Sequence, residues 1–232
     1  NRPDTIVLVA ERSFHLFIDG ECIADPDFPL ESNGVAGAAS VVVGEGGVRE
    51  LWTGLPDGRT ARRRMGVWTV FQPSELKPDE TYYCFARTTA IDGSPRVVAG
   101  RRSGLWELDG DSWRPVQGAV EEQRLLNIYS LCESRSPDGS TVLWCGSLDG
   151  WTYRYEKGQL RAFGPDEGPK DGGVWSLLAS GDDRGTQGLW IGTAGLGLVR
   201  AQFGAWTAID RSAGLVNDSV YRLLVTRDRR GG

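Results

Sequence analysis

The 232-residue sequence has little histidine, cysteine, lysine and methionine. Any Ser-His-Asp triad or multi-histidine metal site would have to be built around one residue, His15. The four cysteines include no CxxC pair, so their spacing matches neither a zinc site nor a small disulfide scaffold. No Gly-Lys dipeptide occurs, which excludes a phosphate-binding P-loop. No apolar run approaches the roughly 18 residues that a membrane-spanning helix requires.

The formal charge of −5 argues against a general nucleic-acid surface, for which a basic balance is expected. Only Lys77, Lys157 and Lys170 are lysines, and the other basic residues are arginines. We therefore expect no nucleic-acid partner, no direct insertion into a membrane and no cofactor. Partners are expected to be another protein, a small ligand or a glycan.

A four-residue motif recurs along the chain with starts 46 residues apart: Leu51–Gly54 (LWTG), Val97–Gly100 (VVAG), Leu143–Gly146 (LWCG) and Leu189–Gly192 (LWIG). A diverged copy, VLVA at Val7–Ala10, precedes the first. Aromatic residues keep the same 46-residue period at Tyr83, Tyr129, Trp175 and Tyr221, while Gly37 takes this place in the earliest copy. Such self-similarity is the signature of a repeat architecture.

Each period holds about four short runs rich in β-branched and aromatic residues, separated by turn signals such as Asp109-Gly110. No long segment with helical periodicity occurs, and 32 glycines disfavour a helical solenoid. Four strands in each period of this length are typical of a β-propeller blade. The sequence therefore predicts an all-β, five-bladed propeller of four-stranded blades.

We expect residues 1–232 to form a single propeller domain. The predicted blade periods are residues 1–34 together with 219–232, then 35–80, 81–126, 127–172 and 173–218. In this arrangement Val220–Val225 pairs with Ile6–Val9 and closes the ring. The alternative is a five-repeat fragment of a larger propeller, which would leave bare sheet edges.

The segment Gly188–Arg200, with Trp206-Thr207 and Gly214–Tyr221, resembles the two-component regulator propeller repeat. The resemblance is good over Leu189–Tyr221, fair over Val97–Trp175 and poor before residue 90. It implies a ligand-sensing or scaffolding part of a bacterial signalling protein, extracytoplasmic and linked to further domains of a larger chain. Without that implication a cytoplasmic location stays open.

Other possible chemistry has a simpler structural interpretation. His15 aligns with the strand position Leu105, so a partly buried strand histidine is expected. Gly195-Leu196-Gly197 is interpreted as a turn. The acidic segments Asp109–Asp111 and Ser180–Asp183 are also interpreted as turns, although carboxylate oxygens at alternate positions would suit a calcium ion as well. Paired carboxylates for glycoside cleavage could come from the long connections, but their spacing selects no pair. The candidates are Asp25, Asp27, Glu31, Asp79, Glu80, Glu121, Glu122, Asp166 and Glu167. We predict no enzymatic activity.

The cysteines provide a test of strand register. A two-residue turn at Asp138-Gly139 would place Cys132 opposite Cys145, close enough for a disulfide if the geometry suits one. The repeat favours the alternative of free core thiols, because the equivalent pairs in other copies are apolar. Cys22 and Cys84 align with serines and are interpreted as ordinary small-residue positions.

In a propeller, the connections from second to third strand and from one blade to the next share one face around the central channel. We predict a ligand-binding mouth there, where aromatics beside polar groups could hold a sugar or peptide. The predicted residues are Arg12, Tyr83, Arg101, Arg102, Asn127, Tyr129, Asp149, Trp175 and Tyr221. The alternative for the periodic aromatics is a packing wedge between blades.

The arginine-rich run Arg59, Arg62, Arg63 and Arg64 is either a solvated face or a docking patch for an acidic partner protein. For the whole chain, the favoured hypothesis is a non-enzymatic sensory or protein-interaction propeller. A lectin-like propeller is the alternative, since similar blades offer several equivalent pockets. A lectin should repeat its polar pocket residues with the period, whereas here the polar loops differ in every copy.

Overall fold

The computed structural model describes residues 6–10, 13–18, 21–25, 27–29, 39–73, 80–90, 92–116, 127–164, 167–169, 172–181, 187–202 and 204–225. Within these ranges the chain is all-β, with 19 strands and two short 3-10 turns at Glu45–Gly47 and Arg211–Ala213. No helix in the described ranges is long and apolar enough to cross a membrane.

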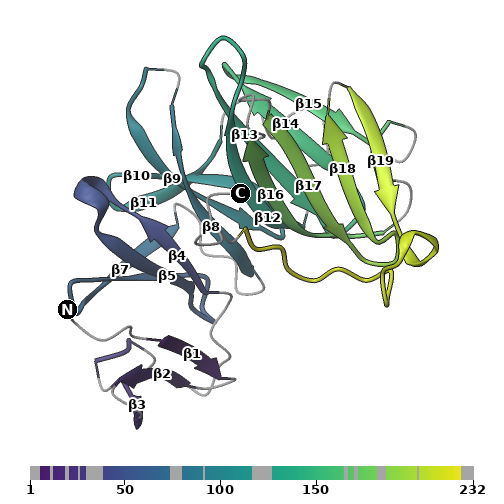
Figure 1. Cartoon of the computed structure of the whole chain (residues 1–232). Helices are drawn as coiled ribbons and strands as arrows, with labels where there is room; N and C mark the ends of the chain where they lie inside the picture. The colour runs from purple at the N-terminus through teal and green to yellow at the C-terminus, as the bar shows by residue number, and fades with distance from the viewer. Residues whose placement is uncertain are drawn as a thin grey trace.

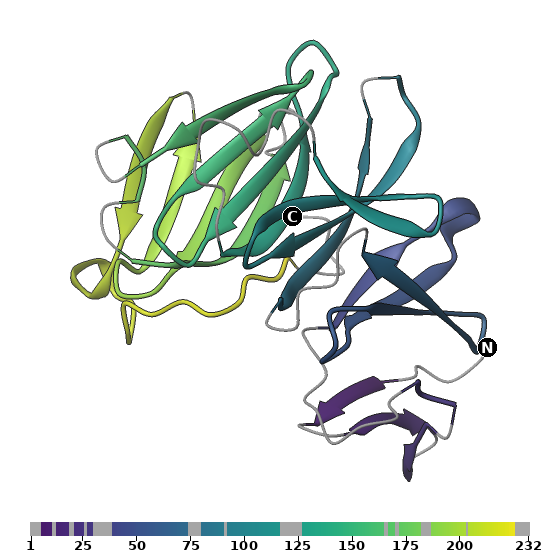
Figure 2. The same ribbon diagram turned by 180° about the vertical axis from the view of Figure 1, so that it is seen from behind.

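Four antiparallel meanders of four strands follow one another along the chain (Figures 1 and 2). Their strands are, in order, β4 (Ala39–Val43), β5 (Arg49–Gly54), β6 (Thr60–Arg64) and β7 (Val67–Pro73); β8 (Tyr82–Thr89), β9 (Pro95–Arg101), β10 (Gly104–Asp109) and β11 (Ser112–Pro115); β12 (Ile128–Arg135), β13 (Thr141–Ser147), β14 (Thr152–Glu156) and β15 (Gln159–Phe163); and β16 (Val174–Gly181), β17 (Gln187–Thr193), β18 (Leu198–Gln202) and β19 (Ala205–Ile209). We refer to them as units 1 to 4.

Before unit 1, strands β1 (Ile6–Ala10), β2 (Ser13–Ile18) and β3 (Glu21–Ala24) form a three-stranded sheet. The outer strands of units 1 and 2 also pair in parallel, β7 with β11 at Gln72–Ser112 and Pro73–Trp113, which joins these two units into one sheet of eight strands. The LWxG-type motifs of units 1 to 4 lie on the second strand of each unit, β5, β9, β13 and β17.

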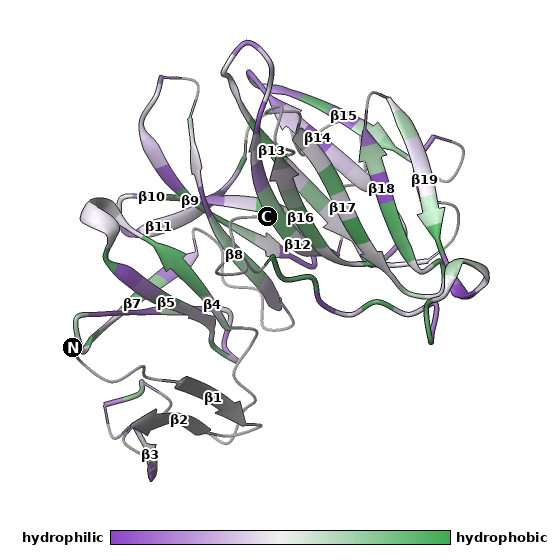
Figure 3. Cartoon of the chain, in the orientation of Figure 1, coloured by the Kyte–Doolittle hydropathy of each residue, from purple (hydrophilic) through white to green (hydrophobic). Residues whose placement is uncertain are grey.

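The first strands of successive units contact one another, β4 with β8, β8 with β12 and β12 with β16, and apolar clusters fill the space between units. Trp52 and Trp113 are fully buried between units 1 and 2, while Leu105 and Ile128 are fully buried between units 2 and 3. Figure 3 shows hydrophobic segments on the strands and a hydrophilic turn between β12 and β13.

The motif glycine permits this close approach. A Cβ atom on Gly146 would lie 2.3 Å from Val174 Cγ1, and one on Gly100 would lie 2.3 Å from the Ile128 carbonyl oxygen. The same contact recurs after unit 4, where a Cβ on Gly192 would lie 2.5 Å from the carbonyl oxygen of Val220. The motif therefore ends in glycine because the next first strand packs directly on it.

The predicted pairing of Val220–Val225 with Ile6–Val9 is not formed. β1 pairs with β2, and the described residues 220–225 form no strand. The C-terminal segment instead follows unit 4, since Ala194 bridges Ser219 and the Val220 N–H donates to the Thr193 carbonyl at 2.9 Å. Figure 1 shows β1–β3 beside unit 1, at the opposite end of the series from unit 4, which explains why the two segments do not meet.

The predicted opposition of Cys132 and Cys145 is also wrong. Cys132 pairs with Trp144, and Cys145 pairs with Leu131. The Ser136 N–H donates to the Ser140 carbonyl, so the loop has three residues and ends with Gly139 at φ 83°, rather than two residues. Because neighbouring strand positions face opposite sides, this one-residue shift separates the two thiols. All four cysteines are free, and Cys145 is a buried core residue as the repeat suggests.

Candidate functional site

The periodic aromatics occupy a special place in the first strands. Strand pairing skips Tyr83 in β8, Tyr129 in β12 and Trp175 in β16, so each is the extra residue of a β-bulge. The residue before each, Tyr82, Ile128 or Val174, is at most 1% exposed and packs between units, whereas the aromatic itself is only half-buried. The bulge thus turns the aromatic side chain out of the ladder.

The packing-wedge role therefore belongs to the preceding residue, and the periodic aromatics form two pairs of neighbouring rings, of which one is tilted and one is stacked. The ring centroids of Tyr83 and Tyr129 are 5.6 Å apart, and those of Trp175 and Tyr221 are 3.9 Å apart at 23°. Arg222 lies between the pairs: its guanidinium carbon is 6.0 Å from the Tyr129 ring centroid, and its Nη1 donates to the Trp175 carbonyl at 3.2 Å. We name these five residues the aromatic mouth.

Arg222 was not predicted as a site residue, because it belongs neither to the LWxG motif nor to the periodic aromatics. Its signal was its place directly after Tyr221, the last periodic aromatic. A guanidinium among aromatic faces can take part in cation–π contacts and still offer N–H donors to a ligand. Tyr221 is 64% exposed, so the mouth is open to solvent at this side.

Three further predicted residues meet at the connection between units 2 and 3. The Asn127 N–H donates to the Arg102 carbonyl at 2.9 Å, and Asn127 Nδ2 donates to Asp149 Oδ2 at 3.0 Å. Asn127 has φ 53°, a left-handed conformation that asparagine tolerates better than most residues. The side chains of Arg102 and Asp149 are exposed, so this edge presents both charges to solvent.

Arg101 does not belong with these groups. It has no exposed surface and lies between the rings of Tyr82 and Trp106, with its guanidinium carbon 4.6 and 4.1 Å from the two centroids. Its Nε is 3.5 Å from Glu80 Oε1. Burial lowers the pKa of Arg101 and raises the pKa of Tyr82 to about 12. Arg101 is therefore a packing residue that solvent does not reach.

Two other repeat positions named from the sequence, Arg12 and Gly37, lie outside the described residues.

The arginine run of β6 is not a free positive patch. Arg63 Nε lies 3.0 Å from Asp25 Oδ2, Arg64 Nε lies 3.6 Å from Glu50 Oε1, and Arg59 pairs with Asp57. The Arg62 guanidinium carbon lies 5.6 Å from the Trp52 ring centroid and 5.1 Å from that of Phe71. Each of these four half-buried side chains thus already has a partner within the chain.

Among the described residues, several candidate catalytic and metal-binding residues have structural roles. Asp25, with its side chain 2% exposed, accepts a 3.1 Å hydrogen bond from Trp68 Nε1 besides its arginine contact. His15 is a half-buried strand residue, as predicted. Asp109–Asp111 forms the turn from β10 to β11 and Gly195–Gly197 the turn from β17 to β18. Across the described ranges no three His, Cys, Asp or Glu residues could hold a metal ion. Glu31, Asp79, Glu121, Glu122, Asp166, Asp182 and Asp183 lie outside these ranges.

No protein-family model matches the chain, and no curated protein sequence matches it. Solved structures do match. The extracellular domain of BT4673 from B. thetaiotaomicron, described in one structure as a one component system and in another as a hybrid two component system, aligns with TM-scores of 0.65 and 0.63 and 16% identity. The first alignment covers 98% of this chain and 29% of BT4673's chain.

BBS1N, solved in complex with ARL6DN, aligns with TM-score 0.60 and 13% identity over 88% of this chain and 63% of its own. The Dos1 propeller aligns with TM-score 0.54 and 11% identity over 85% of this chain and 52% of its own. Identities this low show likeness of fold alone. The chain is therefore an all-β protein with the fold of propeller structures, and it spans less than two thirds of the length of each.

Proposed function

We propose that this chain is a sensory or protein-interaction propeller without catalysis of its own, and that the aromatic mouth is its binding surface. The observation that carries the proposal is the set of bulges at Tyr83, Tyr129 and Trp175, which turn three aromatics out of the sheets at one repeat position. Bulges that re-aim a side chain are typical of functional sites. Arg222 adds donors among the rings.

The proposed architecture is a single domain of five blades of about 46 residues. Units 1 to 4 supply four of them and β1–β3 supply three strands of a fifth; the segment after residue 218 is the proposed source of its fourth strand, although in this structure it lies against unit 4 and not against β1. Support comes from Val220, which lies on Gly192 as Val174 lies on Gly146. Residues 220–222 thus occupy the position of a next first strand, although they form no strand in this structure.

We further propose that the chain belongs to a bacterial signalling protein of the two-component regulator propeller type, as its extracytoplasmic sensing part. The motif resemblance over Leu189–Tyr221 supports this, as does the likeness to the BT4673 extracellular domain. The fold is also compatible with binding a protein partner, since the BBS1N structure contains one.

The mouth is asymmetric, which favours one ligand or partner segment over several equivalent sugars. The Asn127–Asp149 hydrogen bond is made within unit 3, and unit 4 cannot repeat it, because Gly173 and Gly195 stand one period later. A partner segment with an aromatic or aliphatic side chain would stack on the rings, and a carboxylate or backbone carbonyl could accept from Arg222. Arg102 and Asp149 would then contact its polar flank.

The test uses peptide and glycan arrays probed with the purified chain and with the Tyr129→Ala/Trp175→Ala double variant. Val67→Ala, an exposed residue at the start of β7, is the control. We expect peptide binding that the double variant loses and the control keeps. Saturable binding of several sugars per chain, unaffected by the double variant, would contradict the proposal in favour of a lectin.

A further inference from the structure

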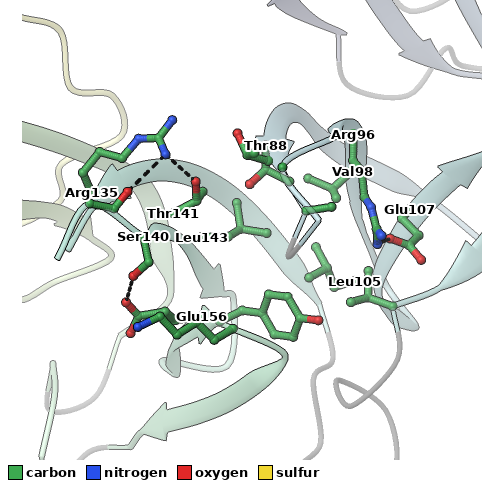
Figure 4. A pocket seen from close by; sticks show the side chains of 17 residues that line it. Thr88, Arg96, Val98, Leu105, Glu107, Arg135, Ser140, Thr141, Leu143 and Glu156 are labelled. Atoms are coloured by element: carbon green, nitrogen blue, oxygen red, sulfur yellow. Dashed lines mark hydrogen bonds and ion pairs between the residues drawn. The ribbon is translucent and has the colours of Figure 1, made fainter.

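A cavity of about 320 Å³ lies between units 2 and 3 (Figure 4), and none of the aromatic-mouth residues lines it. The turn from β8 to β9 and the turn from β12 to β13 contribute to its wall. Figure 4 shows Val98, Leu105 and Glu107 of unit 2 across the cavity from Leu143 and Glu156 of unit 3. Its volume lies at the lower end of the range of small-molecule sites.

The cavity is found where the repeat loses its largest side chain. In units 1, 3 and 4 the second residue of the motif is Trp52, Trp144 or Trp190, and the strand partner of each is an arginine. The guanidinium carbons of these arginines lie 5.6, 5.9 and 5.1 Å from the indole centroids. Unit 2 has Val98 at this position, paired with Glu107. Both residues line the cavity.

The hydrogen-bond acceptor for the missing indole is still present. Trp144 Nε1 donates to Ser134 Oγ at 3.0 Å, and Trp190 Nε1 donates to Ser180 Oγ at 2.9 Å. One period before Ser134 stands Thr88, which lines the cavity and is 8% exposed. Its hydroxyl makes no hydrogen bond within the described residues, and its oxygen is not among the fully buried unpaired atoms, so it remains accessible from the cavity.

The remaining walls suit a flat ring. Leu105 and Leu143 are at most 2% exposed and provide an apolar floor. Leu143 is the equivalent of Leu189, which belongs to the cluster that packs against Trp144 in the next unit interface. Arg96 is held at the cavity by Glu107, and Arg114 Nε lies 3.1 Å from the other oxygen of that carboxylate. Arg96 thus supplies a cation beside the place of the missing ring, as the strand arginines do elsewhere.

We propose that this cavity binds an indole or a similar flat heteroaromatic ring with an N–H donor. The ring occupies the space of the missing tryptophan, its N–H donates to Thr88 Oγ1, and the Arg96 guanidinium contacts its face. The site is separate from the aromatic mouth, so neither proposal depends on the other. The ring can come from a free small molecule or from a tryptophan side chain, and the test distinguishes these sources.

The first experiment measures the binding of indole and of 1-methylindole, which lacks the donor, by titration calorimetry. Since one hydrogen bond contributes about 0.5–1.5 kcal/mol net, we expect indole to bind roughly 2- to 13-fold more tightly. Thr88→Val should remove this preference and leave the affinity for 1-methylindole unchanged. An equal loss for both ligands in Thr88→Val, or no saturable binding of either to the unaltered chain, would overturn the proposal.

A second variant fills the cavity. Val98→Trp restores the tryptophan of the other units and should abolish binding of both ligands, whereas Val67→Trp, at an exposed position of unit 1, should keep it. A thermal unfolding curve reports whether each variant is folded, and undiminished indole binding by folded Val98→Trp would refute the assignment. Tighter binding of N-acetyl-Gly-Trp-Gly-amide than of indole would identify a protein source, and the reverse a small molecule. The mouth variant Tyr129→Ala/Trp175→Ala should bind indole normally.

Discussion

Replacing the motif glycine of unit 3 tests how the units pack. In Gly146→Ala the new methyl group would lie 2.3 Å from Val174 Cγ1 and 2.5 Å from Ser130 Oγ. Ordinary carbon–carbon contacts are about 3.5–4.0 Å, so Val174 would have to move by more than about 1 Å. Val174 is fully buried in the cluster with Leu189, Ile191 and Val199, and it cannot move without opening that interface.

Overpacking of a well-filled core costs about 1–3 kcal/mol, while glycine-to-alanine changes gain about 0.4–1 kcal/mol through the unfolded chain. We therefore expect Gly146→Ala to lower the free energy of unfolding by about 1.3 kcal/mol, or Tm by roughly 3–5 °C for a chain of this size. Urea unfolding followed by tryptophan fluorescence measures the change.

Gly188 provides the matched control. It also lies on the second strand of a unit, but the nearest atom to its added methyl group, Arg200 Nε, would be 3.7 Å away, an ordinary contact. Gly188→Ala should leave stability unchanged or raise it by up to about 1 kcal/mol. If both variants unfold at the same urea concentration, the close contact between units 3 and 4 is not what places glycine in the motif.

Three other outcomes follow from buried groups. Asp25→Ala should cost about 3 kcal/mol in urea unfolding, because it leaves a buried ion pair broken, whereas Asp57→Ala at an exposed pair should cost less than about 1 kcal/mol. Burial raises the pKa of Tyr82 from 10.0 to about 12, so the folded state keeps this proton at a pH where the unfolded chain loses it. The free energy of unfolding should therefore fall as pH rises from 10 to 12, and Tyr82→Phe should flatten that fall. A thiol reagent at pH 8 should label exposed Cys22 rapidly. It should label Cys145 only after unfolding, because this thiol is buried and burial raises its pKa; equal labelling rates would contradict the burial of Cys145.

The strands and their order were predictable because they depend on local signals. The 46-residue period, the LWxG motif and the turn residues mark each second strand and each hairpin, and strands formed at all of these places. Register was harder to predict. The loop at Ser136–Ser140 has one residue more than the assumed turn, and this single residue moved Cys132 from Cys145 to Trp144.

The two candidate sites likewise combine features that the sequence predicts with features that only the structure shows. The sequence by itself determined that aromatics recur at one position and that Val98 replaces a tryptophan, since both are properties of the repeat. Only the tertiary structure decided that Arg101 is buried, that Arg222 lies between the aromatic pairs, and that the space left by the tryptophan stays open. The physical reason is that exposure and cavity volume depend on how neighbouring units pack, and a repeat pattern specifies each unit without specifying what its neighbour places against it.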